Sequence, residues 1–396
     1  MRFGLDRMRR LLTVLGSPQE RYGAIHVVGT NGKSSTTRMI AAILERHGVR
    51  AGAYLSPHLN AFAERIRVGD ADVGEAAFAA SVARARRAAE RVDRTLEEGD
   101  RVTQFEALTA AAFDELAAEG VEVAVVEAGL GGRYDATNVL DARVVVLTNV
   151  GLEHTRWLGP TVADIAREKL AVVPEGGTLV LGADLHPDAR AEADEVAERK
   201  GATIVEAPAD PGVPVHALGD FQLRNFAAAI EAARAWLGQL DAEAVRAAAA
   251  QVAVPGRFQL VAREPDTVLD GAHNPGGMTA LAQSLPGFLR GRELVAVVSV
   301  LDDKDAAGML GALLPHCAQV VVTSNANPRA LSPATLESLV GQVDPDATLH
   351  REPEPKAALA RARTLAGPGG VVLATGSIYL IADLLRSPGQ RRVSML

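Results

Sequence analysis

Short apolar runs rich in valine and isoleucine alternate along this chain with alanine-rich segments whose apolar residues recur at helical spacing. A continuous apolar run predicts a strand buried on both faces, and regular alternation with helices predicts a parallel sheet covered on both sides. This is the pattern of a doubly wound α/β fold. The strands predicted in the first part of the chain are 24–30, 50–56, 121–129, 142–150, 177–184 and 202–208.

A second series of apolar runs begins after the Pro255-Gly256 pair, which is a strong turn signal. We therefore place a domain boundary here and predict a large mostly parallel α/β domain over 1–256 and a smaller α/β domain over 257–396. A chain of 396 residues is long enough for two domains of unequal size. The strands predicted in the second domain are 266–273, 293–301, 317–324 and 369–377.

Two further segments have helical patterns. Leu5, Met8, Leu12 and Leu15 are spaced as the apolar face of an amphipathic helix, with charged residues between them. Residues 76–98, rich in Ala, Arg and Glu, predict a solvated helix rather than a low-complexity tail.

Composition narrows the functional classes. The formal net charge of −8 disfavours a general nucleic-acid binder, since a phosphate backbone attracts a basic face. The single cysteine, Cys317, excludes an intramolecular disulfide and a cysteine-based zinc cluster. No apolar run approaches the roughly 20 residues that span a bilayer. We therefore expect a cytoplasmic protein that binds neither nucleic acid nor membrane.

The segment "HVVGTNGKSSTT" (26–37) resembles a phosphate-binding loop, although Val27 stands where the usual G-x-x-x-x-G-K-[ST] pattern has glycine. Gly29 and Gly32 let backbone N–H groups approach an anion, and the predicted helix from about 34 to 47 adds positive potential at its N-terminus. Lys33 is placed to reach terminal phosphates, and Ser34 to bind Mg²⁺. The alternative is a glycine-rich strand-to-helix turn with an exposed lysine.

A carboxylate, Glu127, ends the apolar strand "VEVAVVE" (121–127) and is followed by "AGLGGR" (128–133). Ligands bind at the carboxyl ends of strands in such sheets, and Mg²⁺ needs only one or two carboxylates besides phosphates and water. Glu127 is therefore a candidate metal ligand; taken alone, it would be a solvated residue at a strand end.

Many motifs in one order resemble the folylpolyglutamate synthase and dihydrofolate synthase family, within the Mur ligase superfamily. They cover nearly the whole chain, which makes them far more specific together than singly. The motifs are "GTNGKSS" (29–35), "LSPHL" (55–59), "AERIRV" (63–68), "FEALT" (105–109), "VEAGLGGRYDATNV" (126–139), "GLEHTRWLG" (151–159), "IAREK" (165–169), "GDFQLRN" (219–225), "PGRFQ" (255–259), "DGAHNP" (270–275), "VLDDKD" (300–305), "NPRALS" (327–332) and "TGSIYL" (375–380).

The resemblance implies a P-loop Mg-ATP domain and a Rossmann-like C-terminal domain, with two magnesium sites. Ser56 and Glu127 would hold one ion, and Glu127 with His154 the other. An isolated histidine at such a place would more often be a hydrogen-bonding loop residue. Lys169 matches the lysine that such ligases carry as a carbamate, whereas its spacing alone would make it a surface residue on a helix.

The resemblance also implies the nucleotide and acceptor contacts. Thr103, Phe105 and Asp135 match positions that hold the pterin, although Phe105 could equally be a core residue. Arg257 could instead form a hinge salt bridge, and Asp270 could be a structural turn residue. His273 would lie near the phosphates, and closure of the two domains would complete the site. ATP would be held by Gly29, Thr30, Asn31, Gly32, Lys33, Ser34, Ser35, Asn225, Arg257 and Asp270, and the catalytic residues would be Lys33, His154, Lys169 and His273.

The activity implied is ATP-dependent addition of L-glutamate to a folate-type carboxylate through an acyl phosphate, by a monomer. The sequence leaves open whether the acceptor is dihydropteroate, a reduced folylglutamate or both. Alternatives are another amino-acid-adding Mur-type ligase and a non-catalytic nucleotide-binding protein. Ser34 stands where the family usually has glycine, so the metal-binding hydroxyl could be that of Ser34 or Ser35. Further departures are "AERI" (63–66) for Asn-Glu-Arg-Ile and Glu153 for aspartate.

Overall fold

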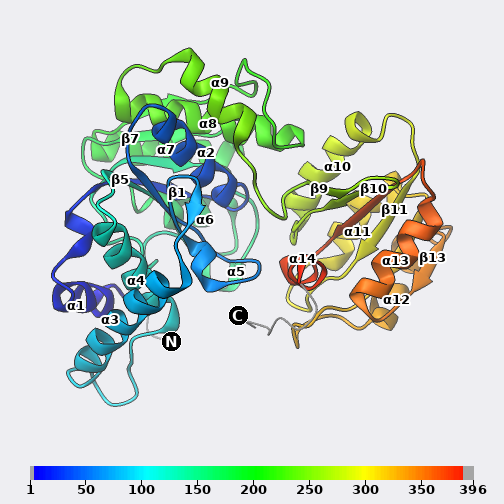
Figure 1. Ribbon diagram of the computed structural model, residues 1–396, viewed down its shortest axis with the longest axis horizontal. Coiled ribbons are helices and arrows are strands. Elements are labelled where there is room, and N and C mark those ends of the chain that lie inside the picture. Colours follow the sequence, from blue (N-terminus) through cyan, green and yellow to red (C-terminus); the bar gives the residue numbers. More distant parts are fainter. Residues whose placement is uncertain (1–3, 387–396) are drawn as a thin grey trace. The chain divides into compact units, whose positions relative to one another are not determined.

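A computed structural model describes residues 4–386 and divides them into two compact units, each with its own sheet (Figure 1). The main change of unit along the chain falls between Val252 and Ala253. Unit 1 consists of the chain up to His58, Phe62–His216 and Leu223–Val252, and unit 2 of Leu59–Ala61, Ala217–Gln222 and the chain from Ala253 onward.

Unit 1 is built on an eight-stranded sheet with the order β4-β3-β2-β5-β1-β6-β7-β8. Its strands from β2 to β8 in that order are parallel, while β3 and β4 add an antiparallel edge. All six predicted strands are confirmed, and the antiparallel pair is new. The strands are β1 Gly23–Val28, β2 Ala51–Tyr54, β3 Ile66–Val68, β4 Ala71–Asp72, β5 Val123–Glu127, β6 Ala142–Leu147, β7 Thr178–Leu181 and β8 Thr203–Glu206.

Helices cover the sheet of unit 1 because alternate residues of its inner strands point to opposite faces and are all buried. On one face α1, α3 and α4 share a core with β2 and β5, and α6 and α7 share one with β6 and β7. Helix α2 packs on β1, β2 and β5, and α9 packs on α2. The helices of unit 1 are α1 Asp6–Val14, α2 Lys33–Arg46, α3 Glu75–Asp93, α4 Gln104–Ala118, α5 Thr155–Leu158, α6 Val162–Leu170, α7 Pro187–Lys200, α8 Asp220–Leu237, whose first residues belong to unit 2, and α9 Ala242–Gln251, with short 3₁₀ turns at η1 Pro18–Glu20 and η2 Phe62–Arg65.

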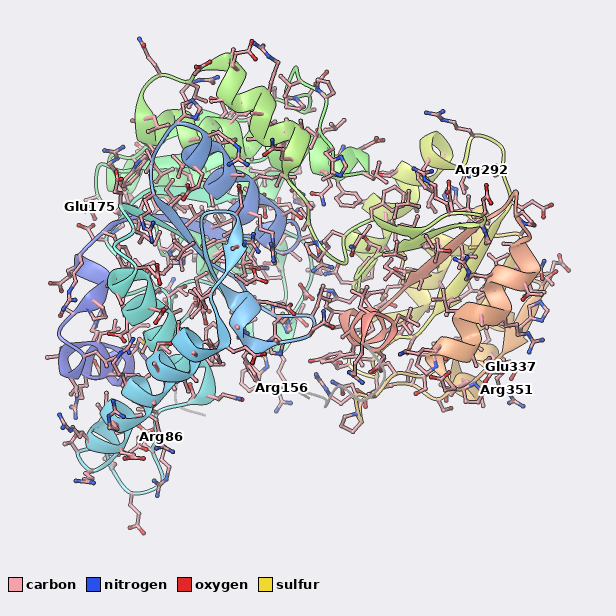
Figure 2. The ribbon with its side chains drawn as sticks, in the orientation of Figure 1. Arg86, Arg156, Glu175, Arg292, Glu337 and Arg351 are labelled. Carbon is pink, nitrogen blue, oxygen red and sulfur yellow. The ribbon has the colours of Figure 1, made fainter. Side chains whose placement is uncertain are left out.

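The two helices predicted from pattern alone are confirmed. Helix α1 buries Met8, Leu11 and Leu12. Helix α3 buries only a narrow stripe of small residues with Val92, and Arg86 on its solvent side is among the exposed charged residues labelled in Figure 2. The predicted helix over 76–98 is therefore confirmed as a half-solvated helix up to Asp93, and residues 94–98 form turns.

Unit 2 has a six-stranded sheet with the order β13-β12-β11-β14-β10-β9, parallel except for the β9–β10 pair. Helices α10, α11 and α12 cover one face, and α13 and α14 the other. The four predicted strands are confirmed, while β9 and β13 are new. The elements are β9 Gln259–Ala262, β10 Asp266–Leu269, α10 Pro275–Leu289, β11 Leu294–Val298, α11 Ala306–Leu313, η3 Leu314–His316, β12 Gln319–Val322, α12 Pro333–Val343, β13 Leu349–Arg351, α13 Pro355–Ala366, β14 Val371–Thr375 and α14 Ile378–Leu385.

Within residues 4–386, none of the helices combines the length and the apolar character needed to cross a lipid bilayer.

Candidate active site

The loop between β1 and α2 is shaped by two glycines. Gly29 and Gly32 have φ of +152° and +83°, and a Cβ at either would overlap a side chain, that of Thr148 or Asn225 respectively. Gly32 is the N-cap of α2 and provides no side-chain cap, so the first-turn N–H groups of the helix have no acceptor in their own helix. Such an uncapped helix N-terminus attracts an anion.

Hydrogen bonds from the loop after β6 hold this turn in shape. Asn149 accepts the N–H of Asn31 at 2.9 Å through Oδ1 and that of Thr30 at 2.9 Å through its carbonyl. The Thr148 hydroxyl and the Asn149 amide both donate to the Asn31 carbonyl, at 2.6 and 3.1 Å. Thr30 and Asn31 therefore shape the loop, and the sequence analysis missed Thr148 and Asn149, whose only signal was their place at a strand end.

Two lysines converge on one backbone carbonyl of this loop. Lys33 Nζ donates to the carbonyls of Gly29 and Thr30, both at 3.0 Å, and Lys169 Nζ donates to the Gly29 carbonyl at 2.8 Å. Lys169 is 5% exposed, so the surface position suggested by its spacing is wrong. Burial, reinforced by the nearby Lys33 charge, lowers the pKa of Lys169 to about 7.

Glu127 lies at the end of β5 with a 1% exposed side chain. Its Oε1 accepts the hydroxyl of Ser34 at 2.9 Å, and its Oε2 accepts the backbone N–H of Ser56 at 3.0 Å. Ser35 is buried in α2, and within the described residues no hydrogen bond joins it to Glu127. Of the two hydroxyls left open by the sequence, that of Ser34 lies beside the carboxylate.

Glu127, Ser34 and Ser56 are candidate ligands of a divalent cation. Within residues 4–386, no group of three or more His, Cys, Asp or Glu side chains forms a ready-made metal site. Mg²⁺ requires less, because phosphate and water oxygens supply most of its ligands. Glu127 offers the hard oxygen atoms that such an ion prefers, with the Ser34 hydroxyl at its Oε1 and Ser56 held at its Oε2 through the backbone N–H, so the residues fit.

His154 is placed by the loop after β6, where it is the N-cap of the short helix α5 with φ of +52°. Its Nε2 lies 3.8 Å from Oε1 of Glu153, and its side chain is 41% exposed. A non-glycine residue with positive φ is uncommon and marks a strained turn. The exposed imidazole is accessible to a ligand.

The three predicted acceptor residues all belong to unit 1. Thr103 is the N-cap of α4, and Phe105 follows in its first turn with its ring centroid 6.5 Å from that of Tyr54. A Cβ at Gly129 would overlap the tip of the Phe105 ring, so this ring covers the chain just beyond β5. Phe105 is half-buried, so it packs against its neighbours while part of it stays accessible.

The third of these residues, Asp135, ends a buried chain of hydrogen bonds. It accepts the N–H groups of Leu130 and Thr137 at 2.8 and 3.0 Å and the Thr137 hydroxyl. His26 Nε2 lies 2.8 Å from the same hydroxyl oxygen. Since that hydroxyl donates to Asp135, the imidazole donates from Nε2, and burial lowers the pKa of His26 to about 4, keeping the ring neutral. His26 therefore links β1 to the loop that carries Asp135, which sequence reasoning did not foresee.

Asn225, from α8, also belongs to unit 1 and lies at the phosphate loop. Its amide is buried against Gly32, so the glycine leaves the space that the amide occupies.

The remaining predicted residues belong to unit 2: Asp270 and His273 lie in the loop from β10 to α10, and Arg257 lies in the turn before β9. Asp270 accepts the N–H groups of Phe258 and Ala272 at 2.8 and 2.7 Å, and burial raises the pKa of its carboxyl. His273 Nδ1 lies 2.9 Å from the Gly271 carbonyl, and a Cβ at Gly271 would approach the Arg257 guanidinium to 2.6 Å. Asp270 and His273 thus share one turn, Arg257 lies in the adjacent turn before β9, and Asp270 has the structural role that the sequence left open.

Two family models match the chain, one in each part of it. The Mur ligase middle domain matches residues 27–200, and the Mur ligase glutamate ligase domain matches residues 256–378. A dihydrofolate synthase/folylpolyglutamate synthase of Mycobacterium tuberculosis is 36% identical over 85% of this chain and 77% of its own. A probable bifunctional folylpolyglutamate synthase/dihydropteroate synthase of Haloferax volcanii is 37% identical over 96% of this chain, which spans 48% of that relative.

Solved structures agree along almost the whole chain. Mycobacterium tuberculosis folylpolyglutamate synthase complexed with ADP has a TM-score of 0.89 at 32% identity, covering 98% of this chain and 96% of that one. Yersinia pestis bifunctional folylpolyglutamate synthase/dihydrofolate synthase, complexed with AMPPNP and Mn ion, has a TM-score of 0.85 at 29% identity, covering 97% and 93%. This chain therefore belongs to the folylpolyglutamate synthase and dihydrofolate synthase family of the Mur ligases.

Proposed function

We propose that this protein is an ATP-dependent ligase that joins L-glutamate to a folate-type carboxylate through an acyl phosphate, releasing ADP and phosphate. One observation carries the proposal: the uncapped start of α2, with Lys33, lies beside the Glu127 carboxylate in a chain of this family. The relatives are named for this activity, and two related structures hold ADP or AMPPNP.

The chemistry follows from the poor electrophilicity of a carboxylate. Transfer of the γ-phosphoryl group of ATP to the acceptor carboxylate gives an acyl phosphate, and the glutamate amine then displaces phosphate to form the amide. Lys33 and the N–H groups of the first turn of α2 would stabilise charge on the phosphates, which is the main protein contribution to such transfers. Gly29, Thr30, Asn31 and Gly32 would shape the loop around them, and Asn225 would support it.

We further propose two magnesium positions, one near Ser56 and Glu127 and one near Glu127 and His154. The Ser34 hydroxyl, beside the same carboxylate, is a further oxygen donor for the first position. Bound magnesium would neutralise phosphate charge during transfer.

A carbamate on Lys169 is a separate part of the proposal. Carbamylation requires a neutral amine, which buries more easily than an ammonium. Within the described residues no carboxylate forms an ion pair with Lys169, and burial outweighs the attraction of Glu153 and Asp135, so that its lowered pKa places a neutral amine within reach of physiological pH. The modified side chain would present an anionic oxygen donor near the phosphate loop.

Thr103, Phe105 and Asp135 are proposed to hold the acceptor, and Arg257, Asp270 and His273 to contact the nucleotide from the C-terminal domain. We keep 1–256 and 257–396 as the two functional domains, and a cytoplasmic monomer as the expected form.

An ADP-release assay tests the activity. Dihydropteroate and tetrahydrofolate are each supplied with L-glutamate and Mg-ATP, and omission of either co-substrate serves as the control. We expect ADP release that requires both the pteridine acceptor and glutamate. Normal Mg-ATP binding without turnover on either acceptor would overturn the folate assignment and favour another amino-acid-adding ligase or a nucleotide-binding protein.

A further inference from the structure

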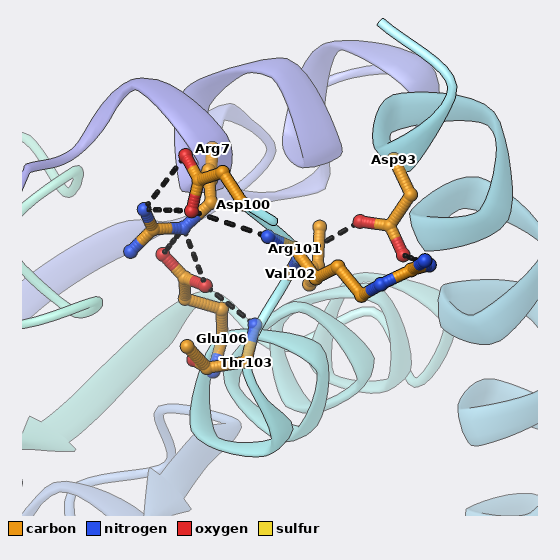
Figure 3. A network of polar contacts seen from close by, with 7 residues as sticks. All are labelled: Arg7, Asp93, Asp100, Arg101, Val102, Thr103 and Glu106. Atoms are coloured by element: carbon orange, nitrogen blue, oxygen red, sulfur yellow. Dashed lines mark hydrogen bonds and ion pairs between the residues drawn. The ribbon is translucent and has the colours of Figure 1, made fainter. Parts of the chain in front are cut away.

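A buried arginine near the start of the chain joins α1 to the loop before α4 (Figure 3). Arg7 Nε lies 3.1 and 3.2 Å from the two carboxylate oxygens of Glu106, and its Nη1 lies 3.0 and 3.3 Å from those of Asp100. The Arg7 and Glu106 side chains are 10% and 7% exposed. One guanidinium thus holds two carboxylates that are far from it in sequence.

Glu106 also caps the helix that it belongs to. Its Oε2 accepts the N–H of Thr103 at 2.7 Å, and the Thr103 hydroxyl accepts the N–H of Glu106 at 3.2 Å, which completes a capping box. The carboxylate that fixes the start of α4 is therefore the one that Arg7 holds.

The chain between α3 and α4 is held at further points. Asp93, at the end of α3, accepts the N–H of Val102 at 2.8 Å, and Asp100 accepts the N–H of Arg101 at 3.1 Å. Figure 3 shows these bonds and the Arg7 pair as one continuous network leading to Thr103. The position of Thr103 is thus set by charged contacts that reach back to α1.

Phe105 connects this network to the proposed site. It lies one residue from Glu106, with its ring tip against Gly129 and its centroid 6.5 Å from Tyr54. Gly129 is two residues beyond Glu127, the proposed metal ligand. A shift in the first turn of α4 would therefore move the ring that covers the loop after β5.

We propose that Arg7 is a positioning residue for the acceptor: it fixes Thr103 and Phe105 through Glu106 and Asp100, and so sets the affinity for the flat heterocycle without touching it. This inference rests on the proposed function, in which Thr103 and Phe105 hold the acceptor. Arginine suits the task because its planar fork donates to two carboxylates at once, which a lysine ammonium does with less geometric control.

Steady-state kinetics of Arg7→Lys test the proposal, with a double variant, Arg7→Met with Glu106→Gln, in parallel. The double variant removes both charges of the Arg7–Glu106 pair, so it stays informative where Arg7→Met alone would leave Glu106 buried without its cation; Asp100, whose side chain is 23% exposed, keeps access to water. Arg84→Lys is the matched control. Arg84 bonds Asp114 and Glu115 in the second half of α4, and so anchors the same helix away from Thr103 and Phe105.

Arg7→Lys is expected to raise the KM for the pteridine acceptor about tenfold while the KM for ATP changes less than about twofold, because small misplacements of positioning groups cost this much. The double variant should also raise the KM for the pteridine acceptor, and Arg84→Lys should leave this KM near the wild-type value. An equal rise with Arg84→Lys, or a rise confined to the KM for ATP, would show a general structural role and overturn the inference. Wild-type protein without turnover on either acceptor would overturn the proposed function first, and this inference with it; wild-type turnover with unchanged Arg7→Lys kinetics would overturn the inference alone.

Discussion

Two loops occupy equivalent places in the two units and differ in how they treat the helix that follows. Each leaves the carboxyl end of an inner parallel strand, from β1 to α2 in unit 1 and from β10 to α10 in unit 2. Helix α2 starts at Gly32 without a side-chain cap, whereas the Asn274 side chain caps α10 by accepting the N–H of Gly277 at 2.7 Å. Asp270 similarly accepts one N–H group of its own loop, that of Ala272, and one of the neighbouring turn, that of Phe258.

This difference in helix capping gives the two loops different binding properties, although both connect a strand to a helix in the same way. The first loop leaves helix N–H groups without an internal acceptor and brings two lysines near, which suits an anionic ligand. In the second loop, side chains accept the N–H groups of Ala272 and Gly277. Side chains are available to a ligand here instead: His273 of this loop and Arg257 of the adjacent turn. Position at a strand end is therefore common to both loops, and capping decides what each can bind.

The largest expected effect follows from removing the cation of the first loop. Lys33→Ala should lower kcat by about 10²–10³-fold, as loss of a group that stabilises developing charge does. The unfolding midpoint should stay near that of the wild type, because Lys33 contributes only two hydrogen bonds to backbone carbonyls. The ADP-release assay measures kcat, with Lys200→Ala, which loses an exposed pair with Glu175, as control. Wild-type turnover by Lys33→Ala would remove this loop from the chemistry.

Alanine substitutions at the two N-caps should affect different properties, ADP affinity for Gly32 and stability for Asn274. Gly32→Ala forces a Cβ onto a residue at φ +83° and into the Asn225 amide, so we expect ADP affinity to fall by about tenfold or more. Asn274→Ala should instead lower the free energy of unfolding by about 1 kcal/mol, the usual cost of a lost N-cap. Calorimetric ADP binding and urea unfolding on both variants distinguish the two outcomes. Equal loss of ADP affinity in both would mean that the capping contrast has no functional meaning.

Sequence pattern found the strands that are continuous apolar runs, since these are buried on both faces. It missed β3, β4, β9 and β13, which are short and carry polar or charged residues; β4, β9 and β13 are edge strands, and β3 lies next to β4. The positions of Lys33 and Glu127 could be predicted from local pattern, because Lys33 stands in the glycine-rich turn after β1 and Glu127 is the last residue of β5.

The roles of His26, Asn149 and Arg7 could not be predicted from local pattern. Their partners lie about a hundred residues away along the chain, and only the folded backbone brings them together. Lys169 was misread on spacing alone for the same reason, because its helix buries the residue that the spacing places at the surface.

The two serines at the start of α2 offer a finer test of the first loop. Ser34→Ala should raise the Mg²⁺ concentration needed for half-maximal turnover several-fold, because it removes the hydroxyl that lies 2.9 Å from Glu127 Oε1. Ser35→Ala should change stability more than metal dependence, since Ser35 is buried within the helix. Mn²⁺ binding followed by electron paramagnetic resonance gives a second reading independent of turnover. The reverse ranking of the two serines would assign the metal-binding hydroxyl to Ser35.

The smallest expected effect concerns Lys169, whose ammonium contacts the same loop. The unfolded chain keeps the ordinary lysine pKa of 10.5, while the fold lowers it to about 7. Between these values the unfolded state binds more protons, so this group makes the unmodified protein more stable as pH rises from about 7 toward 10.5. Urea unfolding under CO₂-free buffer measures this slope, and Lys169→Met should flatten it.

Carbon-13 labelling extends this test to the carbamate. Labelled bicarbonate should give a carbamate signal that grows as pH rises through about 7 in the wild type and is missing in Lys169→Met. An unmodified amine at every pH would remove the carbamate from the proposal while leaving the phosphate loop unaffected.

The outer strands of both sheets are short, which limits aggregation of destabilised variants through their edges. The edge strands β4, β8, β13 and β9 have two, four, three and four residues. A second chain adding itself to such a strand would gain few backbone hydrogen bonds, and short edges are a common protection against fibre growth. Destabilised variants of this protein should therefore refold from urea rather than collect as β-rich aggregates.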